Sequence, residues 1–189
     1  MEVLRLYQPF AANGFQTSPR AIREVVDAKG KRLTRYGLEV KQVYDPSALY
    51  LVNYAMQQTM RSGTGAAAYS RLPKDLVMAG KTGTTNDMRD SWFAGYTGNY
   101  LAVVWLGNDD NKATGLSGAT GALPVWIELM TRLNPTSLQP VQPDNVQWQW
   151  VDKATGKLSA ENCPGALYIP YLANTIPVET VACADGQAA

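Results

Sequence analysis

The chain has 189 residues, of which 46% are hydrophobic and 17% are charged, and its formal net charge is +1. These values are typical of a globular protein with one full core and a small appendage, and they provide no strong field for nucleic acid or an anionic membrane. The absence of histidine and the presence of only two cysteines exclude a histidine-based triad, a His-ligated zinc site and any metal or iron–sulfur site with four thiolates.

The sequence also lacks an apolar run of 18 residues, so we expect no membrane span in it. Met1-Glu2-Val3-Leu4-Arg5 has neither the basic start nor the continuous apolar core of a signal peptide. We therefore expect any targeting sequence to lie upstream. The most basic segment, 29–41, alternates charged with apolar residues, which indicates solvated strand faces rather than a nucleic-acid site.

One helix and two strands are predicted in the first 36 residues. Apolar residues recur at near-helical spacing over 2–12, and Asn13-Gly14 can end this helix. β-prone residues over 21–28 and 32–36 flank Lys29-Gly30, which suits a hairpin turn.

A second helix is predicted to begin after Asp45. Asp45 is a good N-cap, and Pro46 suits the first helical position. Apolar residues follow at helical spacing until Gly63 and Gly65 end the helix. We interpret it as a core-packing helix whose methionines fill gaps. Residues 66–75 are predicted to form a loop.

Three successive strands are predicted next, and they contain Lys81–Thr85, Asp90–Tyr96 and Tyr100–Gly107. Gly98-Asn99 suits a tight turn, so the last two strands should be antiparallel neighbours. After a polar, glycine-rich segment, apolar residues at helical spacing predict a helix over 122–133 that packs on this sheet.

The composition changes at Asn134-Pro135, and three prolines close together indicate a linker. We divide the chain into a main part, a linker and a tail, at 1–134, 135–144 and 145–189. The tail should be a small irregular β subdomain with a strand at 147–152, a turn at Thr155-Gly156 and a disordered end at 185–189.

Both cysteines, Cys163 and Cys183, lie in this tail. We expect a disulfide because it would clip a segment too small to build its own core, with a stabilisation of about 3 kcal/mol in the entropy model. A disulfide implies an oxidising compartment such as a periplasm. The alternative is two unrelated buried thiols.

The most informative stretch is Lys81-Thr82-Gly83-Thr84-Thr85-Asn86. Lys81 supplies a positive charge, and the hydroxyls of Thr82 and Thr84 share one face of a strand, where both can donate to one carboxylate. Gly83 lets a ligand backbone approach closely, and the Thr84 N–H can face a developing oxyanion. The pattern predicts a strand edge that holds an anionic, extended substrate, although a strand start with a hinge glycine would give the same triplet.

The longer context resembles the transpeptidase domain of bifunctional class A penicillin-binding proteins. The resemblance is carried by Met56-Gln57-Gln58, Arg61–Gly65, Ala79–Asn86, Asp90–Tyr96, Val104–Asp109 and Gly118–Ala122. It is close over residues 1–138 and looser over the tail, whose paired cysteines look most like the penicillin-binding protein 1B branch.

This resemblance implies an α+β fold: the C-terminal half of the β-lactamase/transpeptidase-like serine DD-peptidase fold, with an antiparallel sheet packed by helices. The implied activity is a peptidoglycan D,D-transpeptidase that crosslinks stem peptides through a serine acyl-enzyme, needs no cofactor or metal, and is trapped by β-lactams. Lys81 would support the serine of the family's middle motif. Thr82 and Thr84 would bind the terminal carboxylate of the D-Ala-D-Ala end. The Thr84 N–H would be one oxyanion donor, and Gly83 would be permissive.

Only the last of the family's three motifs is present. No serine is followed by Lys three residues later or by Asn two residues later. We therefore expect the nucleophile to precede Met1, and the chain to be inactive alone and associated with the N-terminal half of its domain. The resemblance places the parent protein at the periplasmic face of the inner membrane, held by an upstream anchor. Asn86, Asp90 and Trp92 are expected to be structural.

Three other functions fit the same motif. They are a serine β-lactamase-like hydrolase on the same fold, a non-catalytic penicillin-recognising sensor, and an adhesion or scaffold domain with a chance Lys-Thr-Gly. The stretch Trp92-Phe93-Ala94-Gly95 and the long tail favour the crosslinking enzyme. An upstream glycosyltransferase domain and one membrane helix would mark the bifunctional class.

Overall fold

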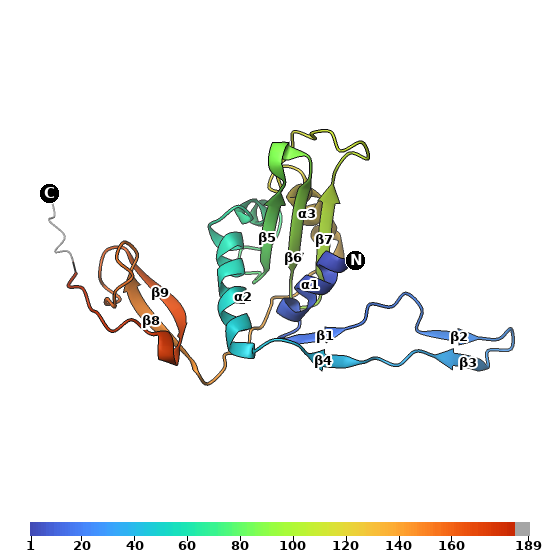
Figure 1. Cartoon of the computed structure of the whole chain (residues 1–189), viewed down its shortest axis with the longest axis horizontal. Helices are drawn as coiled ribbons and strands as arrows, with labels where there is room; N and C mark the ends of the chain where they lie inside the picture. Colours follow the sequence, from blue (N-terminus) through green and yellow to red (C-terminus); the bar gives the residue numbers. More distant parts are fainter. Residues whose placement is uncertain (184–189) are drawn as a thin grey trace. The chain divides into compact units, whose positions relative to one another are not determined.

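The computed structural model describes residues 1–183 (Figure 1). The chain forms two compact units, Met1–Pro140 and Val141–Ala189, and the change from one to the other falls inside the predicted linker, 135–144. Helices and antiparallel strands together give an α+β fold. The predicted disorder of 185–189 lies outside the described residues.

A three-stranded sheet forms the centre of the first unit, in the order β5-β6-β7. Its strands are β5 (Ala79–Thr84), β6 (Ser91–Tyr96) and β7 (Leu101–Leu106). Both pairings are antiparallel. The Thr97 N–H donates to the Tyr100 carbonyl at 2.8 Å in the turn between β6 and β7. The three predicted strands and the predicted hairpin are therefore confirmed.

The three predicted helices are also confirmed, as α1 (Glu2–Ala11), α2 (Pro46–Arg61) and α3 (Ala122–Leu133). The Asp45 carboxylate accepts from the N–H groups of Ser47 and Ala48 at 3.0 Å each, as an N-cap does. At the end of α1, Asn13 and Gly14 both have positive φ, and the Gly14 N–H donates to the Pro9 carbonyl at 2.7 Å. Local sequence signals therefore set these helix ends.

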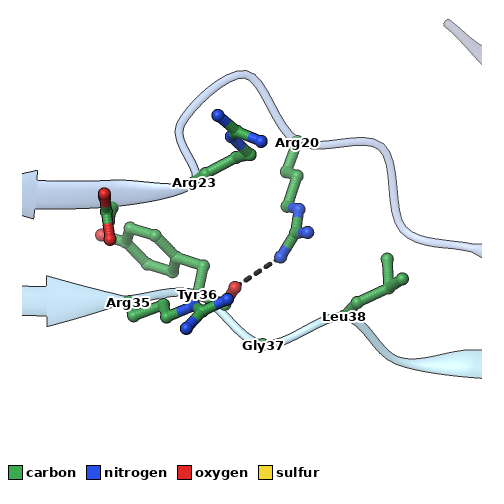
Figure 2. A pocket seen from close by; sticks show the side chains of 7 residues that line it. Arg20, Arg23, Arg35, Tyr36, Gly37 and Leu38 are labelled. Carbon is green, nitrogen blue, oxygen red and sulfur yellow. Dashed lines mark hydrogen bonds between the residues drawn. The ribbon is translucent and has the colours of Figure 1, made fainter.

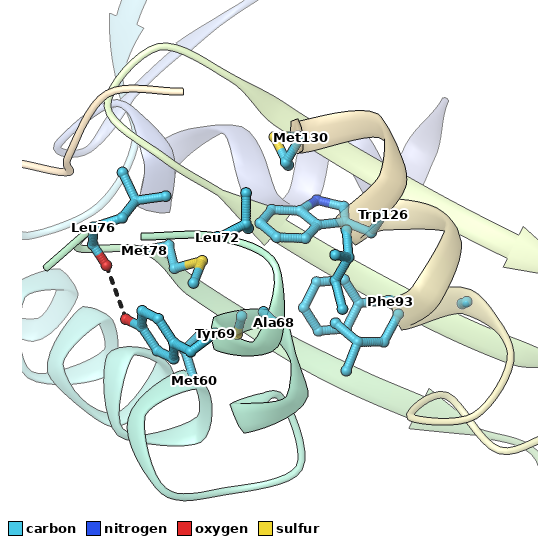
Figure 3. Close-up of a cluster of buried hydrophobic side chains, with 12 residues drawn as sticks. Met60, Ala68, Tyr69, Leu72, Leu76, Met78, Phe93, Trp126 and Met130 are labelled. Carbon is cyan, nitrogen blue, oxygen red and sulfur yellow. Dashed lines mark hydrogen bonds between the residues drawn. The ribbon is translucent and has the colours of Figure 1, made fainter. Parts of the chain in front are cut away.

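The main core lies between α3, the sheet and the end of α2 (Figure 3). The Trp126 ring meets the Phe93 ring edge-on with centroids 5.2 Å apart, and the indole N–H donates to the Gly95 carbonyl at 3.2 Å. A Cβ on Gly95 would lie 2.9 Å from that indole, so the packing requires glycine there. The buried residues of this core are Met60, Ala68, Tyr69, Leu72, Leu76, Met78, Phe93, Ala122, Leu123, Trp126, Ile127 and Met130.

The prediction of a loop over 66–75 is wrong. Residues Ala66–Ser70 form the 3-10 helix η1, and Tyr69 and Leu72 are buried in the main core. The Tyr69 hydroxyl donates to the Leu76 carbonyl at 2.9 Å (Figure 3). A five-residue 3-10 turn has too few residues to show a helical period, so only the tertiary contacts reveal its role in the core.

Residues 15–42, called the arm here, belong to the first unit and extend away from its central sheet as a two-stranded ribbon (Figure 1). It is built from the pairs β1 (Phe15–Thr17) with β4 (Val40–Gln42) and β2 (Glu24–Val26) with β3 (Arg32–Arg35). β2 and β3 lie within the strands predicted at 21–28 and 32–36 and are shorter. β1 and β4 were not predicted, because strands of three residues are too short to show an alternation.

The turn of the arm follows its prediction. Gly30 has φ +80°, and the Asp27 carboxylate accepts from the Lys29 and Lys31 N–H groups at 2.9 and 2.8 Å. Two further 3-10 turns complete the described elements: η2 (Asn86–Met88) in the first unit and η3 (Ala173–Thr175) in the second.

The second unit is an antiparallel hairpin of β8 (Val146–Asp152) and β9 (Ala166–Leu172). Tyr168 lies between Trp148 and Trp150, with ring centroids 5.1 and 4.8 Å from its own. The predicted disulfide between Cys163 and Cys183 is present, with Cα atoms 5.0 Å apart. A stacked aromatic group and a disulfide thus stabilise a unit that has few buried side chains.

No helix within residues 1–183 is both long and apolar enough to cross a membrane. In the same residues, no cluster of three His, Cys, Asp or Glu side chains is placed to hold a metal ion.

Candidate active site

The predicted Lys-Thr-Gly strand is β5, and it lies at the edge of the central sheet. β6 pairs with one side of β5, and no strand within residues 1–183 pairs with its other side. Lys81 and Thr84 are exposed, while Thr82 and Gly83 are half-buried. β5 therefore presents a free row of backbone groups next to its reactive side chains.

The backbone direction of β5 follows from one hydrogen bond just beyond its end. The Thr85 N–H donates to the Asp90 carbonyl at 3.2 Å, so Thr85 faces β6. Successive residues of a strand face opposite sides, so the N–H and C=O groups of Thr84 and Thr82 point away from β6. The Lys81 ammonium group donates to the Thr82 carbonyl at 2.8 Å, so this carbonyl is accessible to a side chain and is not paired with β6.

The hydroxyls of Thr82 and Thr84 share a face, and each meets a partner from a different loop. Thr82 Oγ1 lies 2.8 Å from Thr64 Oγ1, in the loop after α2. Thr84 Oγ1 accepts from the Gly118 N–H at 2.9 Å, in the segment before α3. Two loops therefore fix the two hydroxyls that the sequence places side by side.

Thr64 and Gly118 were not predicted as site residues. Both lie in stretches that carry the family resemblance, Arg61–Gly65 and Gly118–Ala122. That resemblance was the only sequence signal for them, because no local pattern shows that either loop reaches β5.

The charge of Lys81 is not neutralised by a carboxylate. Within the described part of the chain Lys81 forms no ion pair, and its ammonium group contacts only Thr82, at 2.8 Å to the carbonyl and 3.5 Å to the hydroxyl. A lysine without a counter-ion beside two hydroxyls and free backbone N–H groups can attract an anion.

Gly118 packs directly on the backbone of β5 and β6. A Cβ added to it would lie 2.5 Å from the Trp92 carbonyl oxygen and 2.6 Å from the Gly83 carbonyl oxygen. At Gly83 itself a Cβ would lie 3.1 Å from the Trp92 Cβ, a milder conflict. The requirement for glycine is therefore stricter at 118 than within the Lys-Thr-Gly triplet.

Asp90 has structural contacts at the hairpin between β5 and β6. Its carboxylate accepts from the Thr85 hydroxyl at 3.0 Å and from the Trp105 indole N–H at 2.8 Å. Trp92 on β6 lies directly opposite Trp105 on the neighbouring strand β7, with ring centroids 6.1 Å apart. Asn86 begins the 3-10 turn η2. Asp90 and Trp92 therefore make contacts within the sheet, and the structural roles of the three residues stay predictions.

A cavity of about 590 Å³ lies elsewhere, on the arm (Figure 2). It is lined by Arg20, Arg23, Glu24, Arg35, Tyr36, Gly37 and Leu38. Arg20 reaches across the ribbon and donates to the Tyr36 carbonyl (Figure 2). We place the candidate site on β5, because a cation, two fixed hydroxyls and free strand-edge groups come together there.

Comparison with known proteins finds relatives of this chain. Residues 1–123 match the family model of the penicillin binding protein transpeptidase domain. Penicillin-binding protein 1B of Haemophilus influenzae is 37% identical over 152 residues, which is 80% of this chain and 19% of that protein. Penicillin-binding protein 1B of Vibrio cholerae is 36% identical over 173 residues, or 92% of this chain and 22% of that protein.

A solved structure shows the same fold. The crystal structure of penicillin-binding protein 1A from Haemophilus influenzae superposes with a TM-score of 0.85 at 23% identity, over 95% of this chain and 32% of that one. The chain spans about a fifth of the length of the two 1B relatives. The match of the family model, together with these relatives, shows that this chain belongs to the penicillin-binding protein transpeptidase domain family.

Proposed function

We propose that this chain is part of a serine D,D-transpeptidase that crosslinks peptidoglycan stem peptides, and that β5 holds the peptide end of its substrate. The observation that carries the proposal is the open edge of β5, where Lys81 is unpaired among the described residues and the hydroxyls of Thr82 and Thr84 are held by separate loops.

The edge of β5 suits an extended peptide with an anionic end. Such a peptide can add to the sheet as a further strand, because Thr82 and Thr84 direct backbone groups outward. Its terminal carboxylate would accept from the Thr82 and Thr84 hydroxyls, and Lys81 would supply a favourable charge nearby. A D-Ala-D-Ala end meets both requirements, and so does a β-lactam that bears a carboxylate.

The proposed reaction is acyl transfer. A serine Oγ bonds to the carbonyl carbon of the penultimate D-Ala, and its proton passes to the nitrogen of the terminal D-Ala as that residue leaves. An amine of a neighbouring stem peptide then attacks the ester carbon and forms the amide crosslink, while one amine proton passes to the serine Oγ as the ester C–O bond breaks. The Thr84 N–H is proposed to donate to the oxyanion, and one such donor is typically worth about 3 kcal/mol. Lys81 would support the serine of the middle motif through its positive charge.

The nucleophile is proposed to come from an N-terminal partner, because the sequence contains neither a Ser-x-x-Lys nor a Ser-x-Asn motif. We propose the division 1–134, 135–144 and 145–189 for the transpeptidase part, linker and tail. The Cys163–Cys183 disulfide favours an oxidising compartment. We propose the periplasmic face of a bacterial inner membrane, as in the family that this chain resembles.

Labelling with a fluorescent penicillin, followed by denaturing electrophoresis and intact-mass measurement, tests this function. If the protein containing this chain takes up the label on a segment N-terminal to it, the proposal holds. Label on one of the serines of this chain would show that the nucleophile was wrongly placed. No label on the complete protein would contradict the transpeptidase function itself, and rapid loss of the label would favour a β-lactamase-like hydrolase.

A further inference from the structure

Thr64 meets the Lys-Thr-Gly strand through a contact between two hydroxyls. Thr64 Oγ1 lies 2.8 Å from Thr82 Oγ1, and either oxygen can be the donor. We propose that Thr64 is a positioning residue, whose hydroxyl donates to Thr82 and so directs the Thr82 proton toward a bound carboxylate. This inference rests on the proposed function of β5.

The loop after α2 is built to hold Thr64 in one place. The N–H groups of Gly63 and Gly65, on either side of it, both donate to the Thr59 carbonyl, at 3.1 and 3.0 Å. A Cβ on Gly63 would lie 2.9 Å from Thr59 Cα, and one on Gly65 would lie 2.5 Å from Met60 Sδ. The chain is therefore wound tightly against the last turn of α2, with Thr64 between two anchored glycines.

Counting donors leaves two possible directions for this hydrogen bond. A hydroxyl has one proton and two acceptor positions, whereas an ammonium group can only donate. The Lys81 ammonium group lies 3.5 Å from Thr82 Oγ1 and can occupy one acceptor position there. Thr64 then either fills the second position as a donor or takes the Thr82 proton as an acceptor.

A carboxylate bound at Thr82 selects between these two arrangements. The anion needs the Thr82 proton, and Thr82 can give it only when Thr64 donates. The result is a chain from Thr64 to Thr82 to the carboxylate, in which each hydroxyl polarises the next. Thr64 itself then makes no contact with the ligand and acts only through Thr82.

The experiment uses the complete protein that contains this chain, with the variants Thr64→Val, Thr64→Ser, Thr82→Val and the double variant Thr64→Val/Thr82→Val. The rate of acylation is measured with a penicillin and with its methyl ester, which lacks the anionic group. Thr131→Val is the matched control, since the Thr131 hydroxyl donates within α3, to the Glu128 carbonyl at 2.8 Å, and Thr131 belongs to neither β5 nor the Thr64 loop. Melting temperatures show whether each variant folds.

We expect Thr64→Val to lower acylation by the free acid about threefold to tenfold, the range of one hydrogen bond between neutral groups, and to leave the ester unaffected. Thr64→Ser should restore the rate. The double variant should be no slower than Thr82→Val alone, because Thr64 acts through Thr82. Should Thr64→Val fold poorly, the comparison of Thr64→Ser with Thr64→Ala gives the same answer.

Three results would overturn the inference. They are equal losses for acid and ester, effects of Thr64→Val and Thr82→Val that multiply, or no loss on Thr64→Val while Thr82→Val is slow. One further result would contradict the proposed function of β5 rather than the role of Thr64. If Thr82→Val and Thr84→Val leave the ratio of acid to ester rates unchanged, the carboxylate is not bound at β5.

Discussion

The backbone N–H of Gly118 donates to the Thr84 hydroxyl at 2.9 Å and ties the segment before α3 to the strand that carries the Lys-Thr-Gly sequence. The two residues are 34 positions apart. Because the Gly118 N–H fills an acceptor position on Thr84 Oγ1, the Thr84 proton remains available to an incoming carboxylate. This contact leaves no room for a side chain at 118.

Replacing Gly118 by alanine should therefore impair both packing and acylation. The added Cβ would lie within 2.6 Å of two backbone carbonyl oxygens, of Gly83 and Trp92, which cannot move independently of the sheet. We expect a destabilisation of about 1–3 kcal/mol and at least tenfold slower acylation by penicillin. Thermal melts and labelling rates measure the two effects. Gly37→Ala is the control, since a Cβ there meets nothing within 4 Å, and equal behaviour of the two variants would refute the argument.

A second prediction concerns the buried hydrogen bond between Tyr96 and Asn53. The Tyr96 hydroxyl donates to the Asn53 side-chain oxygen, and the Asn53 amide donates to the Phe10 carbonyl at 3.0 Å. Burial, with a smaller effect of Tyr7, raises the pKa of Tyr96, so the hydroxyl remains a donor at neutral pH. These bonds join β6, α2 and α1.

Tyr96→Phe should destabilise the protein by about 1–3 kcal/mol, because it leaves the Asn53 oxygen buried without a donor. Asn53 is only 2% exposed, so water cannot easily replace the lost partner. Chemical denaturation of the variant measures the loss. Tyr36→Phe, at a tyrosine that is 50% exposed on the arm, should change little. A neutral Tyr96→Phe variant would show that the bond contributes nothing to stability.

A third prediction is the acid sensitivity of the ion pairs that Glu128 of α3 forms with Arg132 and with Arg71, the residue after η1. Hydrogen bonds from Arg132 and then from Arg71 lower the pKa of Glu128 from its usual 4.5. The pKa of Glu128 is lower in the folded than in the unfolded protein. The ion pairs therefore stabilise the fold fully above about pH 4.5, and this stabilisation is lost as the pH falls through the folded-state pKa. The Glu128 side chain is 41% exposed, so the effect is screened by solvent and small.

Glu128→Gln should therefore lower the melting temperature by no more than about 2 °C at pH 7 and leave it unchanged well below pH 4. Melting curves recorded from pH 3 to pH 7 give both values. Glu39→Gln is the matched control, since Glu39 meets Lys41 only at 4.0 Å with both side chains more than 70% exposed. The same difference from wild type at every pH would rule out the ionised carboxylate as the cause.

A fourth prediction is that loss of the disulfide destabilises the second unit and leaves the first unit unchanged. The segment before Cys183 is held at Leu158 by two hydrogen bonds, Val181 N–H to the Leu158 carbonyl and Leu158 N–H to the Glu179 carbonyl, at 2.9 and 2.8 Å. Replacing both cysteines by serine should destabilise the second unit by up to about 3 kcal/mol, since the disulfide closes a loop of 20 residues.

Hydrogen exchange should then become faster around Leu158 and Val181 and stay unchanged in β5 to β7. Penicillin labelling should not change, because β5 belongs to the first unit. A loss of labelling in the double serine variant would show that the tail contributes to the active site.

A fifth prediction concerns residues 1–189 expressed alone. The side of the sheet that carries Trp92 and Trp105 lines an open cavity of about 570 Å³ together with the start of α1, and Trp105 is 47% exposed. Apolar surface of this kind favours association. We expect the isolated chain to be unstable or oligomeric, as measured by light scattering and thermal melting. A monomer that melts cooperatively would contradict this expectation.

Elements with strong local signals could be predicted from the sequence. Asp45-Pro46 predicted the start of α2, Asn13-Gly14 the end of α1, and the turn residues Gly98-Asn99 the hairpin of β6 and β7. Such signals act over a few residues, through caps, turns and periodicity, and so they can be read without the fold. The side-by-side placement of Thr82 and Thr84 follows from the same strand period.

The surroundings of those hydroxyls and the composition of the core depend on how the separate elements pack together. This packing placed Thr64 against Thr82 and Gly118 against Thr84, and it buried Tyr69 and Leu72 in a segment predicted to be a loop. These contacts join residues that are distant along the chain, and they depend on which surfaces pack together. A pattern of a few residues contains no information about that choice, because the free energy that fixes it comes from burial and hydrogen bonding between separate elements.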